Sequence, residues 1–351
     1  MTECISKKTG RFSVLFLVLL VAFVIMPAVC YGAQKHKEMK LTMATYFPVN
    51  YPYTYEGGKL FVDMVNKRGK GIVHIDMYWG GTLLKAKALV PGLQAGTADL
   101  IYHVTAYLLG SYPVLGVHSL PVWNNVSESF DRLKVGTPLY KLQNEVLKKK
   151  NLFQLATGGT ISEFIWTRNK LVRKPEDIKG LKIRVAGKVQ AKVIQSLGGS
   201  PVTMPSAEVP QALQRGVVDG VVMNPWTAQG RGVEEFCKYM LVLPVSNLTA
   251  PIYALSDKWN SWPADVRKVL MDVAKDWESK YIAKKGSILC DDQLDTILIP
   301  FYKKKGMKAI YPTKQEIEAF RTATRPVVDW WVKQVGEDVG KKALKYTNYK
   351  Y

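Results

Sequence analysis

Apolar residues recur along this chain with two alternating spacings. Runs in which every second residue is apolar indicate strands, whereas apolar residues three and four positions apart indicate helices. From residue 41 the expected elements alternate in type: strand 41–46, helix 55–68, strand 72–78, helix 83–94 and strand 100–104. Pro91 should kink the second of these helices or mark a break in it.

A second series begins near Phe153. Its expected elements are strands 164–167, 181–185 and 217–223, a helix 189–197 and a short helix 206–214. The helix 189–197 stops at Gly198, and glycine is a common helix terminator. Repeated strand–helix units predict an α/β protein with parallel sheets covered by helices.

A long helical pattern follows Pro263. Apolar residues recur at helical steps to about residue 297, with a break near Gly286 left open. Such a helix is long for a globular domain and suits a brace between two lobes. Another helical stretch begins at Tyr311.

The opening segment has the pattern of a secretory signal. Three bases precede an uncharged apolar run at 12–28, and small residues follow at Gly32 and Ala33. We expect cleavage after one of these two residues, so that residues 1–33 form a signal peptide. Two alternatives stay open: lipid attachment at Cys30, which Val29 disfavours, and an uncleaved anchor, since the run approaches the ~20 residues that span a bilayer.

Removal of residues 1–33 leaves 318 residues, which are long for one core and sufficient for two lobes. The net charge falls from +20 to +18. The bases are scattered, apart from short clusters such as 148–150 and 303–305, and no known nucleic-acid motif accompanies them. We therefore interpret the clusters as solvated surface and expect no nucleic-acid partner.

Metal or redox chemistry is not indicated by the spacing of cysteines and histidines. Cys237 and Cys290 remain after processing, 53 positions apart, and none of the four histidines has metal-ligand spacing. Whether the two cysteines pair or stay as buried thiols is open. We expect no metal and no cofactor.

Several short motifs occur in a specific order. In the second series they are Gly180-Leu-Lys-Ile-Arg184-Val, Gly199-Ser-Pro-Val-Thr-Met204, Glu208-Val-Pro-Gln-Ala-Leu-Gln214 and Gly216-Val-Val-Asp-Gly220. Upstream they are Gly80-Gly-Thr-Leu, Gly92-Leu-Gln-Ala-Gly-Thr-Ala-Asp99, Tyr112-Pro and Leu120-Pro. As an ordered set over roughly residues 41–300, they resemble the solute-binding subunits of TRAP transporters of the DctP type.

This resemblance implies a two-lobed periplasmic binding protein fold, with strands that cross at the hinge and a long helix that bridges both lobes. We assign residues 34–161 and 249–290 to lobe I, and residues 162–248 and 291–351 to lobe II. The resemblance further implies a monomeric periplasmic protein that is not an enzyme. Such a protein captures a small organic anion by lobe closure and delivers it to two integral membrane subunits, one small and one large.

Arg184 is the candidate anchor for a carboxylate. It shares one side of the strand 181–185 with Lys182, and the carboxyl ends of parallel strands open onto the ligand crevice. A planar guanidinium matches a carboxylate bidentately, which a flexible ammonium does not. The strand pattern alone allows a structural pair with a neighbouring acid instead, but the family places its carboxylate-binding arginine in this motif.

Asn224 and Trp226 follow the strand 217–223, where the family places a polar group and an aromatic residue against the ligand. The run here is one residue longer than in some relatives, so Met223 competes with Asn224 for that position. Asn224 is the better candidate because an apolar pocket needs polar groups to orient its ligand. A turn role before Pro225 is the alternative.

Some acid-binding members carry a second basic residue on the strand around Phe164, but this chain has no arginine there before Arg168. We therefore expect a monocarboxylate with an apolar or aromatic body rather than a dicarboxylate or a sialic acid. Phe164 either stacks on that body or belongs to the core. The complete predicted ligand-binding set is Arg184, Asn224, Trp226, Phe164, Tyr46, Tyr102 and Met204, in which the two tyrosines belong to the facing lobe.

Two other functions stay open. The segment Leu155-Ala-Thr-Gly-Gly-Thr-Ile-Ser162 resembles the nucleophile motif of exported asparaginases, with Thr157 as the nucleophile. That motif belongs near the mature N-terminus, however, and the His-Gly-Thr-Asp motif of that family is absent from this sequence. A binding protein for an ATP-driven importer would share the two-lobed architecture and differ in its partners.

Overall fold

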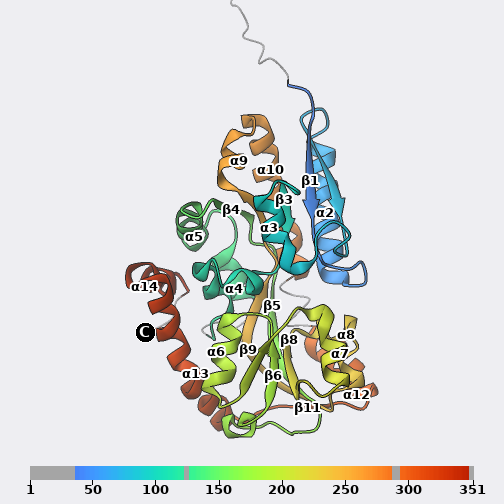
Figure 1. Ribbon diagram of the computed structural model, residues 1–351, viewed down its shortest axis with the longest axis vertical. Coiled ribbons are helices and arrows are strands. Elements are labelled where there is room, and N and C mark those ends of the chain that lie inside the picture. The colour runs from blue at the N-terminus through green and yellow to red at the C-terminus, as the bar shows by residue number, and fades with distance from the viewer. Residues whose placement is uncertain (1–35, 122–125, 287–292, 348–351) are drawn as a thin grey trace, which may run out of the picture. The chain divides into compact units, whose positions relative to one another are not determined.

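The computed structural model describes residues 36–121, 126–286 and 293–347 (Figure 1). The expected signal peptide, with Cys30, and also Cys290 lie outside the described residues, so cleavage, lipid attachment and a disulfide stay predictions. Residues 38–351 form one compact unit, to which the elements below belong. None of the helices described is both long enough and apolar enough to cross a membrane.

The first of two sheets has five strands in the order β2-β1-β3-β10-β4. Their bounds are β1 Met39–Ala44, β2 Val73–Tyr78, β3 Leu100–Tyr102, β4 Leu152–Ala156 and β10 Ile252–Leu255. Strand β1 pairs in parallel with β2 and β3, as strand–helix units predict, whereas β10 is antiparallel to β3 and β4. Helices α2 (Pro52–Arg68) and α10 (Ala264–Asp276) pack against this sheet and against each other.

The helix expected at 83–94 is shorter in the structure. A 3₁₀ turn at Ala86–Ala88 leads into α3, which spans Leu89–Gln94. Pro91 therefore lies in the first turn of α3 and does not kink a longer helix. The N–H that proline lacks would have had no partner within the helix at that position.

The second sheet has six strands in the order β11-β9-β5-β8-β6-β7. Their bounds are β5 Thr160–Thr167, β6 Lys182–Val185, β7 Ser200–Thr203, β8 Gly220–Met223, β9 Tyr239–Thr249 and β11 Lys308–Ile310. Strands β7, β6 and β8 are parallel, and β5 is antiparallel to β8 and β9. The accompanying helices are α6 Lys188–Ser196, α7 Val209–Gln214, α8 Pro225–Gly230 and α12 Ile299–Lys304.

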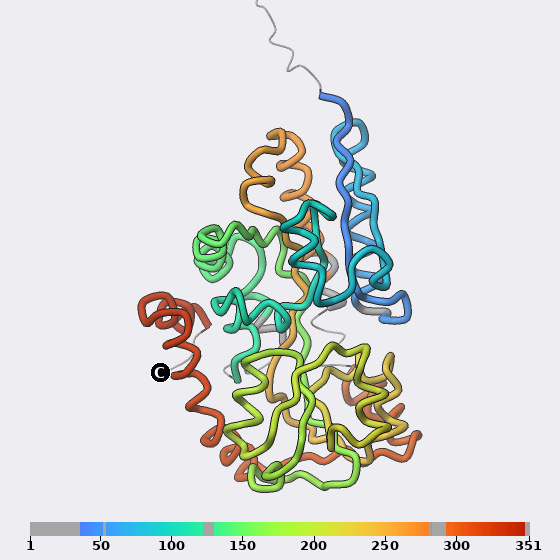
Figure 2. Tube along the Cα trace, viewed as in Figure 1, coloured from blue at the N-terminus to red at the C-terminus, as the bar shows by residue number. Residues whose placement is uncertain are grey.

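The chain crosses between the two sheets twice, and the crossings lie side by side (Figure 2). One leads from β4 to β5 through residues 157–159, and the other leads from β9 to β10 through residues 250–251. Thr160 pairs with Thr249 directly beside them. This geometry is that of strands crossing at a hinge, although the predicted lobe boundaries themselves stay predictions.

A buried carboxylate fastens the first crossing to its surroundings. Glu278 Oε1 accepts hydrogen bonds from the backbone N–H groups of Thr157 (2.6 Å) and Gly158 (3.2 Å), and its Oε2 accepts from Val135 N (2.6 Å). Glu278 belongs to a π-helical segment, Trp277–Gly286, that continues α10. The described part of the predicted long helix is therefore continuous from Ala264 to Gly286.

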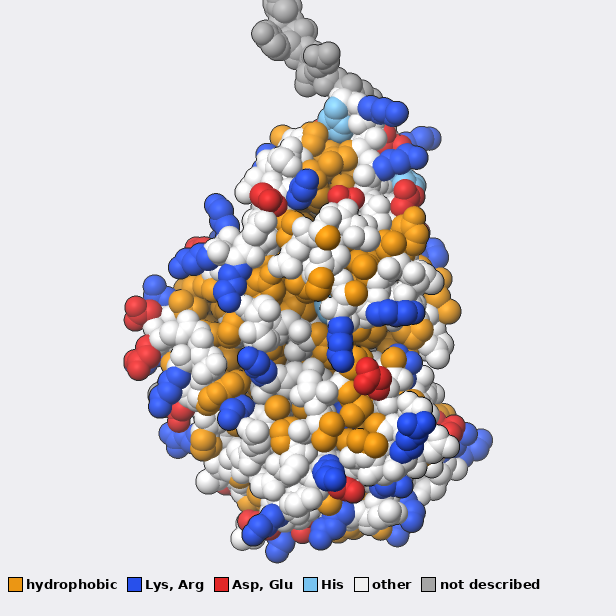
Figure 3. All heavy atoms as spheres, in the orientation of Figure 1, with side chains coloured by type: hydrophobic (Ala, Val, Ile, Leu, Met, Phe, Trp, Pro, Cys, Tyr) orange, Lys and Arg blue, Asp and Glu red, His pale blue; other side chains and the backbone are white. Residues whose placement is uncertain are grey.

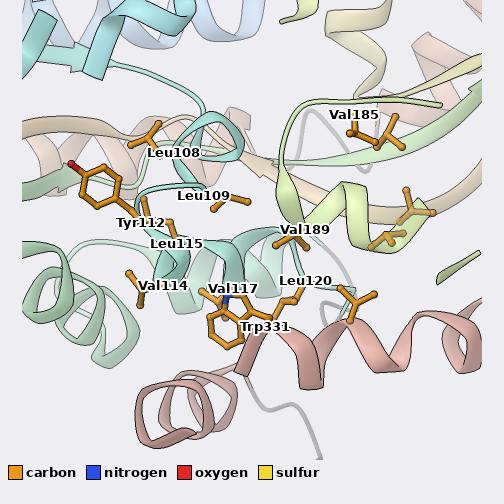
Figure 4. Packing of buried hydrophobic residues seen from close by; sticks show 14 of the residues in the cluster. Leu108, Leu109, Tyr112, Val114, Leu115, Val117, Leu120, Val185, Val189 and Trp331 are labelled. Atoms are coloured by element: carbon orange, nitrogen blue, oxygen red, sulfur yellow. The ribbon is translucent and has the colours of Figure 1, made fainter. Parts of the chain in front are cut away.

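The C-terminal helices pack around an apolar 3₁₀ segment, Pro113–Ser119. Helix α13 (Lys314–Val335) contacts this segment and α6, and α14 (Glu337–Tyr346) contacts α13. Figure 4 shows Trp331 of α13 reaching toward Val117, and its Nε1 donates to the Pro113 carbonyl at 2.8 Å. The remaining helices and helical turns are Thr105–Leu108, α4 Val126–Leu133, α5 Pro138–Lys148, Pro175–Ile178, Ser206–Glu208, Val233–Glu235, α9 Ser256–Ser261 and Leu294–Leu298.

Basic side chains are dispersed over the face shown in Figure 3, with acidic side chains among them. Several basic residues of the chain form surface ion pairs one helical turn apart, such as Lys59 with Asp63 and Lys268 with Asp272. Such pairs contribute little to stability. The distribution agrees with the solvated surface expected from the sequence.

Candidate functional site

A cavity of about 40 Å³ lies where the two sheets face each other. Its lining comes from the segments after β1 and β3 on one side, from β5, β6 and the end of β8 on the other, and from both crossings. Four of the seven predicted ligand-binding residues line it: Arg184, Asn224, Trp226 and Tyr46. Residues distant in sequence thus converge on one partly open cavity.

Arg184 of β6 is the positively charged group of this lining. The side chain is only 2% exposed. Its Nε and Nη2 donate to the carbonyl oxygen of Met204 at 3.0 and 2.7 Å, and Nη1 donates to the carbonyl oxygen of Val222 at 3.3 Å. These bonds hold the plane of the guanidinium in one orientation, because a guanidinium is a rigid fork of donors.

Tyr107 connects Arg184 to the opposite side of the cavity. It lies in the 3₁₀ turn after β3, and its hydroxyl oxygen accepts hydrogen bonds from Arg184 Nη2 at 3.3 Å and from Ser206 N at 2.9 Å. A guanidinium has five N–H donors, and the hydrogen bonds to Met204, Val222 and Tyr107 use four of them. One N–H donor of Arg184 is therefore left to bind an anion. The N–H that donates to Tyr107 at 3.3 Å makes only a long hydrogen bond.

Glu163 of β5 is the acidic group of the same lining, and the sequence analysis did not select it. The side chain is 2% exposed. Its Oε2 accepts hydrogen bonds from Gln190 Nε2 and from Ser246 Oγ, the latter at 2.6 Å. Burial raises the pKa of Glu163, whereas the Ser246 hydroxyl, the charge of Arg184 and Gln190 lower it.

Asn224 and Trp226 lie at the start of α8. Asn224 caps this helix, because its Oδ1 accepts a hydrogen bond from Thr227 N at 2.9 Å. The residue is 3% exposed and lines the cavity, as does Met223, so both candidates for this position are close to the ligand space. Asn224 therefore combines the turn role with a place in the lining.

The predicted residues of the facing lobe separate in the structure. Tyr46 lines the cavity and packs against Tyr107, with ring centroids 5.6 Å apart, and burial raises its pKa well above the ordinary value. Tyr102 is not a lining residue; its side chain packs edge-on against Phe47 (4.9 Å), which lines the cavity, and against Trp277 (6.4 Å). Ligand contact by Tyr102 stays a prediction that this arrangement does not favour.

Phe164 and Met204 belong to the core cluster beneath the second sheet. The side chain of Phe164 is 2% exposed and is not part of the cavity lining. Met204 contributes its carbonyl oxygen to Arg184, so its backbone orients the anchor. These placements favour the core alternative for Phe164 and a supporting role for Met204.

Two further hydroxyl groups of the lining are those of Tyr51 and Ser206. Tyr51 Oη and Ser206 Oγ are buried near each other, and neither makes a well-formed hydrogen bond in the described part of the chain. Leaving a buried polar atom unpaired is costly. A polar ligand in the cavity would relieve that cost.

Thr157, the nucleophile of the asparaginase alternative, is fully buried in the first crossing. Its Oγ1 donates to the Leu133 carbonyl at 2.7 Å and accepts from Gln154 Nε2 at 2.8 Å. The hydroxyl thus serves a structural role. Among the described residues, no group of three or more His, Cys, Asp or Glu side chains is placed to hold a metal ion.

Comparison with known proteins supports this picture. The family profile "Bacterial extracellular solute-binding protein, family 7" (DctP) matches residues 43–334. The C4-dicarboxylate-binding periplasmic protein DctP of Rhodobacter capsulatus is 27% identical over 222 residues, which cover 60% of this chain and 64% of that protein. The sialic acid-binding periplasmic protein SiaP of Vibrio cholerae is 26% identical over 303 residues, which cover 82% and 87%.

Solved structures show the same fold. A TRAP periplasmic solute binding protein from Ralstonia eutropha with bound (S)-2-acetolactate is 25% identical and covers 89% of this chain and 99% of its own, with a TM-score of 0.76. The predicted two-lobed α/β fold and the resemblance to TRAP solute-binding subunits are thereby confirmed, and this family consists of solute receptors, not of enzymes. The chain belongs to the DctP family of bacterial extracellular solute-binding proteins, family 7.

Proposed function

We propose that this protein is exported to the periplasm, captures a small monocarboxylate as a monomer and delivers it to the two membrane subunits of a TRAP transporter. The single observation that carries the choice of ligand is the buried guanidinium of Arg184, which faces the cavity with one unused N–H donor. Glu163 of the same lining makes no ion pair with Arg184 among the described residues, so an anionic ligand group is the natural direct partner of the guanidinium.

The small cavity favours a small ligand. Its volume of about 40 Å³ corresponds to roughly three water-sized spheres. Arg184 is the one arginine or lysine among its lining residues, which supports a single carboxylate. The bound (S)-2-acetolactate of the Ralstonia eutropha protein is likewise a small monocarboxylate.

Lobe closure is the proposed means of capture. Tyr107 approaches Arg184 and Ser206 across the cavity, so the two sides meet around the ligand space. A ligand that contacts both sides binds the closed state better and shifts the equilibrium toward it. Closure in turn creates the surface that the membrane subunits recognise.

A thermal-shift screen tests the ligand class. The mature protein is heated with aliphatic and aromatic monocarboxylates, with matched dicarboxylates, and with uncharged amides of the same acids. A ligand at 100 times its Kd stabilises the folded state by about 2.7 kcal/mol, so we expect a clear rise in Tm for small monocarboxylates. Stabilisation by amides and acids alike would contradict carboxylate recognition.

Delivery is tested in proteoliposomes that contain the two membrane subunits. We expect uptake of the identified acid only with the binding protein present and with an ion gradient across the membrane. Uptake that needs ATP instead of the gradient would favour the ATP-driven alternative.

A further inference from the structure

The cavity walls hold two opposite charges, not one. Among the lining residues, Arg184 is the cation and Glu163 is the carboxyl group, and each is 2% exposed. They come from different strands, β6 and β5, and no ion pair joins them in the part of the chain that the structure describes, although the charge of Arg184 lowers the pKa of Glu163. A monocarboxylate at Arg184 would satisfy one of these groups and leave the other facing the ligand.

One carboxyl oxygen of Glu163 accepts hydrogen bonds from the protein, and the other accepts none among the described residues. Both donors, Gln190 Nε2 and Ser246 Oγ, bond to Oε2. Within the described residues, Oε1 accepts no hydrogen bond. Burial raises the pKa of Glu163, and the hydrogen bond from Ser246, the charge of Arg184 and the hydrogen bond from Gln190 oppose that rise. A cationic group at Oε1 would stabilise the ionised carboxyl further.

Gln190 is fixed by its own contacts and so gives Glu163 a rigid support. It lies in the first turn of α6, and its Oε1 accepts from Ala186 N at 2.6 Å and from Gly187 N at 3.2 Å. Its amide hydrogens must therefore point away from these backbone groups, toward Glu163. The carboxyl is thus positioned by the fold and not by chance packing.

We propose that the physiological ligand is a small zwitterion, an aminocarboxylate whose carboxylate contacts Arg184 and whose ammonium group contacts Glu163 Oε1. This inference rests on the proposed function and narrows the monocarboxylate to one that also carries a cationic nitrogen. The ligand then presents one positive and one negative charge to walls of opposite sign. A buried carboxylate left without such a partner would oppose binding.

The size of the cavity restricts the choice further. Room for roughly three water-sized spheres favours a short side chain over a long one. The hydroxyls Tyr51 Oη and Ser206 Oγ add neutral polar contacts. The aromatic group of Trp226 supplies an apolar surface for the side chain.

Calorimetric titration with ligand triplets of identical carbon skeleton tests the proposal. The probes are alanine, lactate and pyruvate; valine, 2-hydroxyisovalerate and 2-oxoisovalerate; and phenylalanine, phenyllactate and phenylpyruvate. We expect the wild type to bind the amino member at least ~10-fold more tightly than the other two in at least one triplet. Equal or tighter binding of the hydroxy or oxo member in every triplet that binds overturns the proposal.

The variant Glu163→Gln supplies the second readout. It keeps the shape and the hydrogen bonds of the residue but removes the charge, so we expect the amino member to lose about 30-fold or more in affinity. The hydroxy and oxo members should keep or gain affinity. Equal losses for all three members overturn the ammonium contact, and if Glu163→Gln does not fold, the wild-type ratios alone decide.

The outcomes separate this inference from the proposed function. Tight binding of hydroxy or oxo acids that depends on Arg184 overturns the ammonium contact and leaves carboxylate capture intact. Failure of every acid and amino acid to bind contradicts both.

Discussion

Replacing Gly158 with alanine should disrupt the hinge at which the two sheets are joined. Gly158 has a φ of +68°, and a Cβ at this position would lie 2.1 Å from the Ala250 carbonyl oxygen of the other crossing. The positive φ alone costs roughly 1–2 kcal/mol for an L-residue. The overlap is with backbone, so the two crossing segments must separate, and we expect a total loss of about 3–5 kcal/mol.

This change is measured by thermal unfolding and by ligand titration. At about 2–4 °C per kcal/mol for a chain of this size, Gly158→Ala should lower Tm by roughly 6–20 °C. Ligand affinity should fall as well, because Gly159 and Ala250 line the cavity beside this contact.

Gly96→Ala is the matched control. Its φ of +74° is similar, but a Cβ there meets nothing within 4 Å, so it reports the backbone term alone. We expect a loss of roughly 1–2 kcal/mol and unchanged affinity. Equal effects of the two substitutions would refute the argument that close approach of the crossings determines the result.

Three further predictions concern single side chains. Burial raises the pKa of Glu278 from 4.5 to about 7, so its contribution to stability is complete below about pH 4.5 and is lost as the pH rises through 7. Between pH 5 and pH 8, the unfolding free energy of the wild type should therefore fall by up to about 3 kcal/mol relative to that of Glu278→Gln. Urea unfolding at several pH values measures this difference, and parallel pH profiles of the two proteins would contradict the prediction. Asn224→Ala should lower the unfolding free energy by about 1 kcal/mol, because the α8 cap is lost, and it should also weaken ligand binding. Asn224→Asp is the control, since it should restore the cap but not the binding. Full ligand binding by Asn224→Ala would remove this residue from the site. Tyr107→Phe should weaken ligand binding about 3- to 30-fold, because the backbone N–H of Ser206 loses its hydrogen-bond acceptor across the cavity. An unchanged affinity in calorimetric titration would argue against closure through this contact.

Much of the fold could be predicted because its elements have clear periodicity. The parallel strands β1, β2 and β6 and the helices α2 and α6 lie close to their expected positions. Strands β9 and β10 were not predicted, because the burial of β9 does not alternate regularly and β10 is buried at every residue. Their place depends on pairing with distant strands.

The residues of the candidate site also divide into those that the sequence could predict and those that it could not. Arg184 could be selected because its strand alternates and its motif resembles that of the family. On β5, by contrast, every residue is buried, so the sequence does not reveal which side chains face the cavity. The pairing register also shifts between Glu163 and Ile165, and the structure places Glu163, not Phe164, in the lining.

Tyr107 and Ser206 could not be predicted for a different reason. Both lie in short 3₁₀ turns without a motif, and they approach each other across the cavity only when the two sheets come together. The sequence offered no specific signal for these two residues, only the general rule that a ligand pocket requires a few polar groups.

The most direct test of the central claim is calorimetric titration of Arg184→Ala with the acid or amino acid that binds the wild type most tightly. The variant should remain folded, as judged by circular dichroism, and should lose at least about 30-fold in affinity, because one partner of a buried charged contact is removed. Near-normal affinity in a folded Arg184→Ala protein would contradict the assignment of Arg184 as the carboxylate anchor.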